Sequence, residues 1–360
     1  MKRKIVTIVG TRPQFIKGAV LSRGFRTHPQ VEEVMVHTGQ HRDPDMSDRF
    51  FEELEIALPK YNLGVHQLAH GAMTGRMLEK IERVLLHEQP EWVVLYGDTN
   101  STLAGALAAK KLGMKTAHVE AGLRCFANDM PEEVNRILTD RMSDVLFCPT
   151  AAAVENLQRE GYGNGGCKIV HCGDIMYDAA LYYGEKSAAG SKIIKKTDLE
   201  KERFVLATMH RAENTDDLFK LQSIVSALNR IHEEIQVLVP LHPRTRKALR
   251  RITVIPEFTI IGPVGYFDMI ELYKNCKLVM TDSGGMQKEA YFFRKPCVTF
   301  RERTEWVESV ADGVNVMAGS DAERIWAGFR RFCTGNLIFR EGLYGHGHAG
   351  DSIIKELLGV

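Results

Sequence analysis

Short apolar runs alternate with helical stretches along this whole chain, and the alternation constrains its fold more than any other feature. Six runs rich in β-branched residues lie in the first half, at 4–10, 34–39, 92–98, 115–120, 145–149 and 168–173. After a polar stretch, six more follow at 204–209, 237–242, 259–262, 278–282, 296–300 and 314–317. Strands separated by helices predict parallel sheets with crossover helices. The two series therefore predict an α/β protein with two similar, doubly wound domains.

The length of 360 residues also favours two domains, because it exceeds what one ordinary core holds. We expect an N-terminal Rossmann-like domain over 1–183, a polar and flexible linker over 184–201 and a C-terminal Rossmann-like domain over 202–348. The segment 349–360 predicts an amphipathic helix that could pack on the N-terminal domain. Doubly wound sheets bind ligands beyond the carboxyl ends of their strands. The active site is therefore expected in a cleft between the two domains.

Composition and charge exclude several classes of protein. Lys and Arg number 47 against 46 Asp and Glu, and this net charge of +1 argues against a nucleic-acid or membrane-surface partner. No apolar run approaches the roughly 18 residues of a membrane-spanning helix, and residues 1–10 predict a strand instead of a signal peptide. The seven cysteines include no Cys-x-x-Cys pair, so neither a zinc site nor a disulfide framework is expected. We expect a cytoplasmic protein without a bound metal.

Two glycine-containing turns between a strand and a helix could bind phosphate. In Gly-Thr-Arg-Pro-Gln-Phe-Ile-Lys at 10–17, Arg12 and Lys17 could hold an anion at the helix N-terminus. In Thr-Asp-Ser-Gly-Gly at 281–285, the glycines would let backbone N–H groups approach a phosphate, and Glu289 could accept hydrogen bonds from ribose hydroxyls. The alternative for Arg12 and Lys17 is plain surface charge, and the alternative for 281–285 is a turn in which the glycines are only structural.

Neither turn is a Walker loop, because Gly-x4-Gly-Lys-Ser/Thr occurs nowhere in the chain. Gly-x-Gly-x-x-Gly occurs at 161–166 and at 345–350, and neither links an expected strand to a helix, because the first precedes an expected strand and the second directly follows none. The sequence therefore predicts no dinucleotide and no other cofactor, whereas a nucleoside diphosphate fits both turns.

Carboxylates gather at the expected strand ends of the first half. Asp98 and Glu120 end neighbouring strands, where a buried charge is costly unless it is paired or used, so a functional role is favoured. Glu132 and Glu133 follow Pro131 at a helix start, where helix capping and function are equally good interpretations.

The second half offers His210 and His242, each just past an expected strand and each close to an arginine. Both are candidates for proton transfer or phosphate binding. A single histidine at such a place is more often only hydrogen-bonded, which remains the alternative for each.

Seven motifs, in this order, make the chain resemble the non-hydrolysing UDP-N-acetylglucosamine 2-epimerase family. They are Gly-Thr-Arg-Pro-Gln-Phe-Ile-Lys, Thr-Gly-Gln-His, Gly-Asp-Thr, His-Val-Glu-Ala-Gly-Leu-Arg, Pro-Glu-Glu-x-Asn-Arg, His-Arg-x-Glu-Asn and Thr-Asp-Ser-Gly-Gly. The resemblance implies the two-domain GT-B architecture, with UDP held mainly by the C-terminal domain and the sugar facing the N-terminal acids. A UDP-sugar as partner and a homodimer are further implications.

The resemblance also implies roles at the matching positions. The implied catalytic set is Asp98, Glu120, Glu132 and His210. The implied set for binding UDP and sugar is Arg12, Lys17, Arg136, Arg211, His242, Ser283, Gly284, Gly285, Glu289 and Arg301.

Chemistry favours one mechanism for such an isomerase. The C2 proton of a 2-acetamido sugar is not next to a carbonyl, so it cannot be exchanged quickly without activation. Because no dinucleotide fingerprint is present, expulsion of UDP from C1 together with the C2 proton is favoured over oxidation. UDP would then add back to a 2-acetamidoglucal with C2 inverted. This route needs carboxylates for proton transfer and a cationic pocket for UDP.

Two departures from the usual family pattern bear on the substrate: Ala212 within His-Arg-Ala-Glu-Asn, and Thr-Glu-Trp-Val-Glu at 304–308. Both resemble the branch that epimerises UDP-2,3-diacetamido-2,3-dideoxy-glucuronate, an enzyme of surface polysaccharide precursor synthesis such as that of O-antigen. Trp306 could widen the apolar part of a sugar pocket or be a core aromatic. The alternative substrate is UDP-N-acetylglucosamine, and more distant alternatives are a GT-B glycosyltransferase or a sugar-nucleotide sensor.

Overall fold

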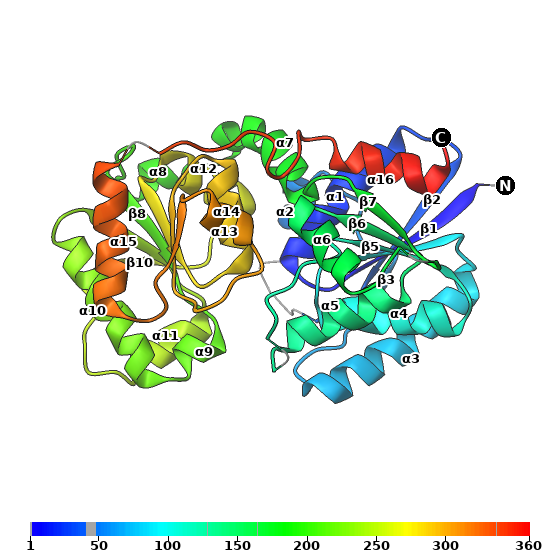
Figure 1. Ribbon diagram of the computed structural model, residues 1–360, viewed down its shortest axis with the longest axis horizontal. Helices are drawn as coiled ribbons and strands as arrows, with labels where there is room; N and C mark the ends of the chain where they lie inside the picture. Colours follow the sequence, from blue (N-terminus) through cyan, green and yellow to red (C-terminus); the bar gives the residue numbers. More distant parts are fainter. Residues whose placement is uncertain (1, 41–47, 128, 164, 336) are drawn as a thin grey trace. The chain divides into compact units, whose positions relative to one another are not determined.

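The backbone forms two compact units, each a parallel sheet between layers of helices (Figure 1). The structure, a computed structural model, describes residues 2–40, 48–127, 129–163, 165–335 and 337–360. Unit 1 comprises Met1–Leu181 and Gly342–Val360, and unit 2 comprises Tyr182–Glu341.

Unit 1 is built on a sheet of seven strands in the order β3-β2-β1-β4-β5-β6-β7, all paired in parallel. The strands are β1 Arg3–Val9, β2 Val31–His37, β3 Tyr61–Asn62, β4 Trp92–Tyr96, β5 Lys115–Val119, β6 Val145–Cys148 and β7 Lys168–His171. The helices are α1 Arg12–Arg26, α2 Asp48–Glu53, α3 His70–Glu88, α4 Asn100–Lys111, α5 Pro131–Met142, α6 Ala151–Arg159, α7 Ile175–Gly190, of which the first part lies in this unit, and α16 Ala349–Leu358. The strand order reverses between β1 and β4.

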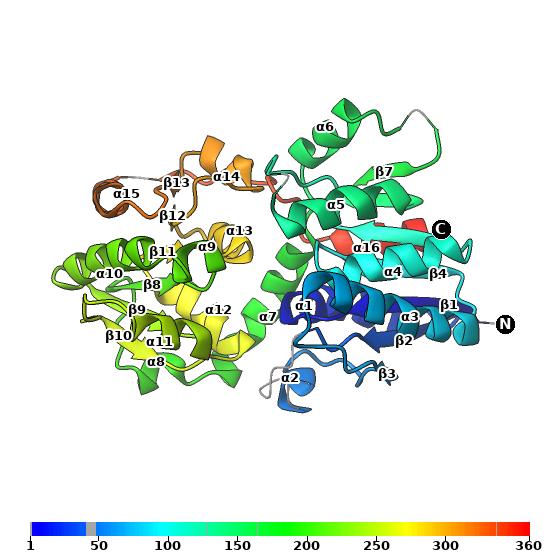
Figure 2. The ribbon, with the colours of Figure 1, turned by 90° about the horizontal axis from the view of Figure 1, so that it is seen from below.

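Helices cover both faces of this sheet, α3, α4 and α5 on one side and α1 and α16 on the other (Figures 1 and 2). The hydrophobic strands explain this arrangement, because a run buried on both faces needs a layer on each side. Val6 and Ile8 of β1 pack with Val93 and Leu95 of β4 against the apolar face of α3 and the small residues of α4. The carboxyl ends of β1, β4 and β5 then lie at one edge of the sheet.

Unit 2 repeats the plan with six strands in the order β10-β9-β8-β11-β12-β13. Its strands are β8 Phe204–Thr208, β9 Gln236–Pro240, β10 Thr259–Ile261, β11 Leu278–Thr281, β12 Cys297–Thr299 and β13 Asn315–Met317. Its helices, after the end of α7, are α8 Ile193–Lys196, α9 Ala212–Thr215, α10 Leu218–His232, α11 Pro243–Leu249, α12 Tyr266–Asn275, α13 Gly284–Phe292, α14 Val307–Ala311 and α15 Ala322–Thr334.

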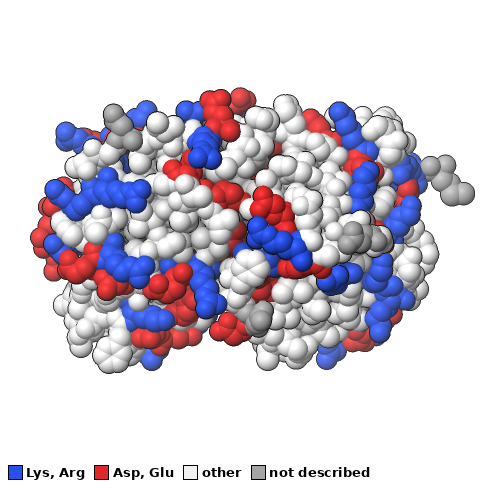
Figure 3. All heavy atoms as spheres, in the orientation of Figure 1, with Lys and Arg blue, Asp and Glu red and all other residues white. Residues whose placement is uncertain are grey.

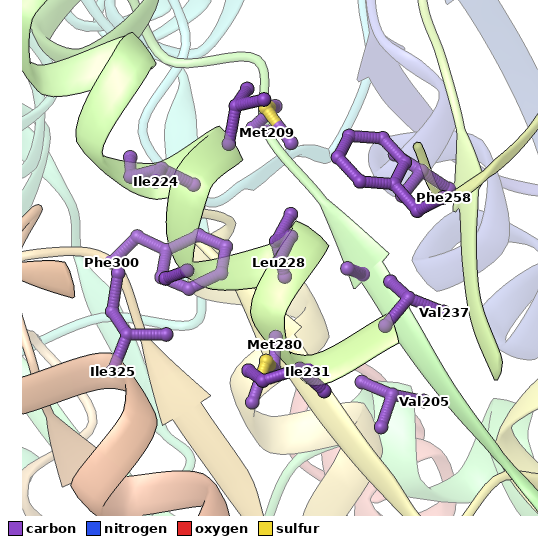
Figure 4. Packing of buried hydrophobic residues seen from close by; sticks show 14 of the residues in the cluster. Val205, Met209, Ile224, Leu228, Ile231, Val237, Phe258, Met280, Phe300 and Ile325 are labelled. Carbon is purple, nitrogen blue, oxygen red and sulfur yellow. The ribbon is translucent and has the colours of Figure 1, made fainter. Parts of the chain in front are cut away.

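The core of unit 2 shows the period-two alternation of strands that are buried on both faces. Val205 and Ala207 of β8 face the layer that contains α10, whereas Phe204 and Leu206 face the layer that contains α12 and α13. Figure 4 shows Leu228 and Ile231 of α10 packed over the first of these faces. The strand order reverses between β8 and β11, and at such a reversal doubly wound sheets bind their ligands.

The structure differs from the expected linker at 184–201. Helix α7 continues to Gly190 and α8 follows at once, and Ile193 lies in the core of unit 2. Lys274 Nζ donates to the carbonyl of Gly184 at 2.8 Å, which fixes this segment to α12. The chain passes between units inside α7, after Leu181. A composition rich in Lys, Ser and Ala suits an exposed helix as well as a linker, so polarity alone did not distinguish them.

The C-terminal helix α16 packs on α1 of unit 1, and the chain returns to that unit at Gly342. A Cβ atom at Gly24 would lie 2.2 Å from Ile354 Cδ1, which shows how closely the helices approach. Arg3 donates from its guanidinium to the carbonyls of Leu357 and Leu358 and so holds the end of α16.

Acidic and basic side chains are interspersed over the face of the molecule drawn in Figure 3, in keeping with the net charge of +1. Within the described ranges, no helix combines the length and the apolar character needed to cross a membrane.

Candidate active site

Gln14 connects the two turns that follow β1 and β4, at the reversal of strand order in unit 1. Its Oε1 accepts from the N–H groups of Gly10 and Thr11 at 2.8 and 3.2 Å. Its Nε2 donates to the carbonyl of Tyr96 at 2.7 Å and to Thr102 Oγ1 at 2.9 Å. Gln14 is buried, so these bonds replace water and hold the two turns in one arrangement.

Lys17 of α1 and Glu120, which follows β5, form a buried ion pair beside these turns. A Cβ atom at Gly97 would lie 3.1 Å from Glu120 Oε2 and 3.3 Å from Lys17 Nζ, so the pair lies directly over Gly97. Glu120 has a φ of +74°, a left-handed conformation that is costly for this residue type. Backbone strain of this kind concentrates at functional sites.

Asp98 follows β4 and pairs with a buried arginine of α5. Asp98 Oδ2 accepts from Arg136 Nη2 at 2.5 Å, and the Asp98 side chain remains 31% exposed. Arg136 Nη1 donates to Glu133 Oε2 at 2.8 Å, and Glu133 is almost fully buried. The carboxylate of Asp98 is therefore held in place from behind while staying accessible from the carboxyl edge of the sheet.

The two glutamates at the start of α5 have different surroundings. Glu133 is held by Arg136 and by the backbone N–H groups of Cys125 and Phe126, so its role here is structural. Glu132 is half-buried, and its side chain makes no hydrogen bond or ion pair with the described residues. Glu132 is therefore the member of the pair that is free to act on a ligand.

A buried network supports the Glu120 turn from below. His118 of β5 bonds to Asp140 Oδ1 through Nδ1 and to the carbonyl of Gly97 through Nε2, both at 2.7 Å. Arg124 Nη1 lies 2.8 Å from Asp140 Oδ2. Burial alone would raise the pKa of Asp140, but the hydrogen bonds and charges of His118 and Arg124 hold it below its ordinary value.

Arg12, the first residue of α1, is only partly buried, and its guanidinium lies 5.3 Å from the centre of the Phe50 ring. The Thr-Gly-Gln-His motif is described as far as Gln40, whose Oε1 accepts from the Ser101 hydroxyl at 2.7 Å. His41, the last residue of that motif, lies outside the described residues.

His210 and Asp282 meet at the reversal of strand order in unit 2. Asp282 is fully buried, and its carboxylate accepts from the backbone N–H groups of His210 and Arg211 at 3.0 to 3.1 Å. Its Oδ1 also lies 3.3 Å from His210 Nδ1, while the His210 side chain is 50% exposed. A carboxylate at Nδ1 orients the ring, so Nε2 is the nitrogen presented to a ligand.

The Gly-Gly turn begins α13, and its two glycines differ. Ser283 caps the helix by accepting from the N–H of Met286. A Cβ at Gly284 would lie 2.1 Å from Glu305 Oε1, whereas a Cβ at Gly285 would meet nothing closer than Ser283 Oγ at 3.9 Å. Gly284 is therefore required for packing, and exposed Gly285 leaves the helix N-terminus open to an anion.

Arg301, which follows β12, is buried behind this turn. Its Nη1 donates to Glu305 Oε2 at 2.9 Å, and its Nε lies 3.9 Å from Glu213 Oε1. Its Nη2 is buried and has no hydrogen-bond partner among the described residues. A buried N–H donor without a partner is costly, which points to an acceptor supplied by a ligand.

The remaining residues of the expected UDP set lie on neighbouring elements. His242 is exposed and caps α11 with Nδ1, and partly buried Arg211 begins α9 as its cap residue. Glu289 of α13 accepts at Oε2 from the hydroxyl of Tyr273 at 2.8 Å. Burial raises the pKa of Tyr273 well above its ordinary value, with a further contribution from Glu289, so this hydroxyl stays protonated and donates.

Trp306 is a core residue. It is buried, its backbone N–H donates to Thr304 Oγ1, and Lys288 Nζ lies 4.3 Å from the centre of its ring. The structure thus favours the core interpretation of Trp306. Arg303, which precedes Thr304 in the chain, is an exposed cation. Its side chain makes no hydrogen bond or ion pair in the part of the chain that the structure describes.

The structure brings the expected residues together within each unit. Lys17, Glu120, Asp98 and Arg136 share one edge in unit 1, and His210, Arg211, the Gly-Gly turn and Arg301 share the corresponding edge in unit 2. Sequence reasoning did not assign Gln14, Glu133, Asp140 or Asp282. Two of these lie inside the motifs Gly-Thr-Arg-Pro-Gln and Thr-Asp-Ser-Gly-Gly, so a polar residue next to a glycine turn was the available signal.

Comparison with known proteins identifies the family of the chain. The profile of the family described as UDP-N-acetylglucosamine 2-epimerase matches residues 23–358. The chain belongs to this family. It is an enzyme, an isomerase of the UDP-sugar 2-epimerase class, and the Rossmann-like units are those of the GT-B architecture found among its structural relatives.

Individual relatives carry more specific names. A Pseudomonas aeruginosa protein named UDP-2,3-diacetamido-2,3-dideoxy-D-glucuronate 2-epimerase is 51% identical over 98% of this chain and 99% of its own length. A Methanococcus maripaludis UDP-N-acetylglucosamine 2-epimerase homolog is 48% identical, again over 98% and 99%. The crystal structure of Methanocaldococcus jannaschii UDP-GlcNAc 2-epimerase in complex with UDP-GlcNAc and UDP matches with a TM-score of 0.91 at 38% identity, and each chain is covered completely.

Proposed function

We propose that the protein inverts C2 of a UDP-2-acetamido sugar, from the gluco to the manno configuration, without hydrolysing it. The proposal is carried by one observation: carboxylates from the ends of neighbouring strands, Asp98 after β4 and Glu120 after β5, reach the same edge of one sheet, and each is paired with a cation. Such groups can remove and return a proton on a sugar placed at that edge.

The proposed reaction is an anti elimination followed by re-addition. A carboxylate takes the C2 proton while the bond from C1 to the UDP oxygen breaks, and the electron pair of the C2–H bond becomes the C1=C2 bond of a 2-acetamidoglucal. A proton is then delivered to the other face of C2, and the UDP oxygen bonds again to C1. Asp98, Glu120, Glu132 and His210 are the proposed acid–base groups.

UDP is the proposed leaving group and nucleophile, so it must be stabilised as an anion and retained. The open N-terminus of α13 at Gly285 supports a diphosphate site in unit 2, as does Arg301 Nη2, which has no hydrogen-bond partner within the described ranges. His242, Arg211, Ser283, Gly284 and Glu289 complete the proposed set there, and Arg12, Lys17 and Arg136 are assigned to the substrate from unit 1. The proposed reaction uses no cofactor or metal.

UDP-2,3-diacetamido-2,3-dideoxy-glucuronate is the favoured substrate, and UDP-N-acetylglucosamine is the alternative. The 51% identity to the Pseudomonas aeruginosa enzyme supports the first. Trp306 does not support this substrate, because its ring is buried in the core. Exposed Arg303 does support it, because its guanidinium could bind the C6 carboxylate of a glucuronate. The alternative is supported by the UDP-GlcNAc complex of the Methanocaldococcus jannaschii relative.

The deciding experiment offers both sugar nucleotides to the purified protein and compares kcat/KM for C2 inversion. We expect the diacetamido glucuronate to be preferred, and Arg303→Met to reduce turnover of this substrate while leaving that of UDP-N-acetylglucosamine unchanged. If UDP-N-acetylglucosamine is inverted equally well or better, the substrate assignment is wrong while the reaction class stands. If neither is inverted, the proposed reaction is wrong.

The biological setting is part of the proposal. A uronate of this kind is a precursor for surface polysaccharides such as O-antigen, and we place the enzyme in the cytoplasm as a homodimer. The resemblance to its family supports these assignments.

A further inference from the structure

Phe126 stands out on the segment between β5 and α5, which begins at Glu120 and leads to the helix that carries Glu132. Its side chain is 68% exposed, and its φ is +56°. Positive φ is rare for residues other than Gly, Asn and Asp, and it is a genuine outlier for a bulky side chain. An aromatic ring is therefore presented to solvent from a backbone conformation that disfavours it.

A buried carboxylate fixes this conformation. Glu133 Oε1 accepts from the backbone N–H of Phe126 at 2.8 Å and from that of Cys125 at 3.1 Å. Glu133 is only 1% exposed, so its charge has to be compensated by these donors and by Arg136. The positive φ at Phe126 is thus fixed by hydrogen bonds to a buried residue of α5.

The same contacts lead to Asp98. Arg136 donates from Nη1 to Glu133 at 2.8 Å and from Nη2 to Asp98 at 2.5 Å. One guanidinium therefore sets the position of the backbone at Phe126 and that of a proposed catalytic carboxylate. Because rigid support of this kind is what positions substrate-contacting groups, the backbone that carries the ring is fixed relative to Asp98.

Exposure by itself would not distinguish Phe126. Phe219, near the start of α10, is 89% exposed, but it sits in an ordinary helical conformation. Phe126 combines exposure with strain, and no ring contact with another described residue is recorded for it. Strain persists only where the surrounding structure imposes it, and it concentrates at ligand-binding sites.

We propose that the ring of Phe126 packs against the sugar of the UDP-2-acetamido substrate, covering its C–H face and an acetamido methyl group. This inference rests on the proposed function and adds a substrate-binding residue to it. Aromatic rings supply apolar contact at little conformational cost, and apolar walls with few polar groups are typical of small-molecule sites. Since Phe126 touches the sugar and not the nucleotide, it should discriminate UDP-sugar from UDP.

The test uses Phe126→Asn, which removes the ring but tolerates positive φ, together with Phe126→Tyr, which keeps the ring, and Phe219→Asn as an exposed control. We expect Phe126→Asn to lower kcat/KM by about tenfold, mostly through KM, because contact with the bound sugar is lost. Calorimetry should show weaker binding of the UDP-sugar and unchanged binding of UDP. The Tm of Phe126→Asn should equal or exceed that of the wild type, because Asn adopts the positive φ at this position with less strain. The other two variants should resemble the wild type.

Several outcomes would overturn the inference. The first is activity of Phe126→Asn within twofold of the wild type. The second is an equal loss of affinity for UDP and UDP-sugar in this variant together with a lower Tm. The third is a change of its oligomeric state in light scattering while its affinity for the UDP-sugar is unchanged. A wild-type protein that inverts neither sugar nucleotide would refute the proposed function, not this inference. The comparison of UDP-sugar with UDP binding would still decide whether the ring contacts the sugar.

Discussion

The two units carry opposite charge arrangements at corresponding edges of similar sheets. In unit 1 the accessible partner is an acid, since the Asp98 side chain is 31% exposed while that of Arg136 is buried. In unit 2 the accessible partner is a base, since the His210 side chain is 50% exposed while that of Asp282 is fully buried. One fold thus presents carboxylates from one unit and basic groups from the other.

The two edges therefore suit different parts of the proposed reaction. Accessible carboxylates suit proton transfer at a sugar carbon, whereas an oriented histidine, a helix N-terminus and an arginine with an open N–H suit a diphosphate. The buried partner in each pair fixes geometry. Within the pairs Asp98–Arg136 and His210–Asp282, exchanging the accessible group should therefore affect activity, and exchanging the buried one should affect stability.

The largest expected effect comes from the three acids of unit 1 proposed for proton transfer, of which Asp98 and Glu132 are accessible and Glu120 is buried against Lys17. Asp98→Asn, Glu120→Gln and Glu132→Gln should each lower kcat by roughly 10²-fold or more, the size expected for general acid–base groups. UDP affinity should stay near that of the wild type in Asp98→Asn and Glu132→Gln, because UDP is assigned to unit 2. Steady-state kinetics and calorimetry measure both quantities.

His242→Asn in unit 2 provides the matched contrast, because Asn also accepts hydrogen bonds at a helix N-cap. This variant should bind UDP more weakly with its fold intact. Equal weakening of UDP binding by Asp98→Asn and His242→Asn would break the comparison. Near-normal kcat in any one of the three acid variants would remove that residue from the catalytic set.

A smaller effect concerns Asp140, the buried acid beneath the Glu120 turn. Asp140→Asn should lower the free energy of unfolding by about 3 kcal/mol at pH 7, because Arg124 would lose a buried partner. The pKa of Asp140 lies below its ordinary value of 3.8 in the folded protein, so its contribution is complete above that value and is lost as pH falls through the folded pKa.

Urea unfolding of wild type and Asp140→Asn at several pH values checks this. The difference in unfolding free energy should be constant from about pH 7 to 5 and should shrink below about pH 4. A difference that grows towards low pH would contradict the sign, and no difference at pH 7 would mean that Asp140 is not a supporting charge.

Much of the fold could be predicted from the sequence because its strands are buried on both faces and appear as continuous apolar runs. All twelve expected runs contain strands. The two-residue β3, Tyr61–Asn62, was not predicted, since so short an edge strand leaves no pattern. The helix over 184–190 was also missed, because a polar, exposed helix and a linker share one composition.

The candidate site was predictable only where a motif placed a chemical group at a strand end, as with Asp98, Glu120 and His210. Asp282 and Glu133 were missed as supporting groups because their roles depend on backbone N–H groups and side chains distant in sequence. The choice between Glu132 and Glu133 could not be made from the motif, since adjacent residues of a helix point to different faces and the motif does not show which face is buried.

The central claim is that the acids of unit 1 exchange the C2 proton with solvent while UDP leaves C1. The most direct measurement is turnover of the preferred UDP-sugar in D2O, without added NAD or metal, followed by NMR of the product. Our account predicts deuterium at C2 of the epimerised sugar nucleotide. Retention of the original hydrogen at C2, or turnover only when NAD is supplied, would contradict it.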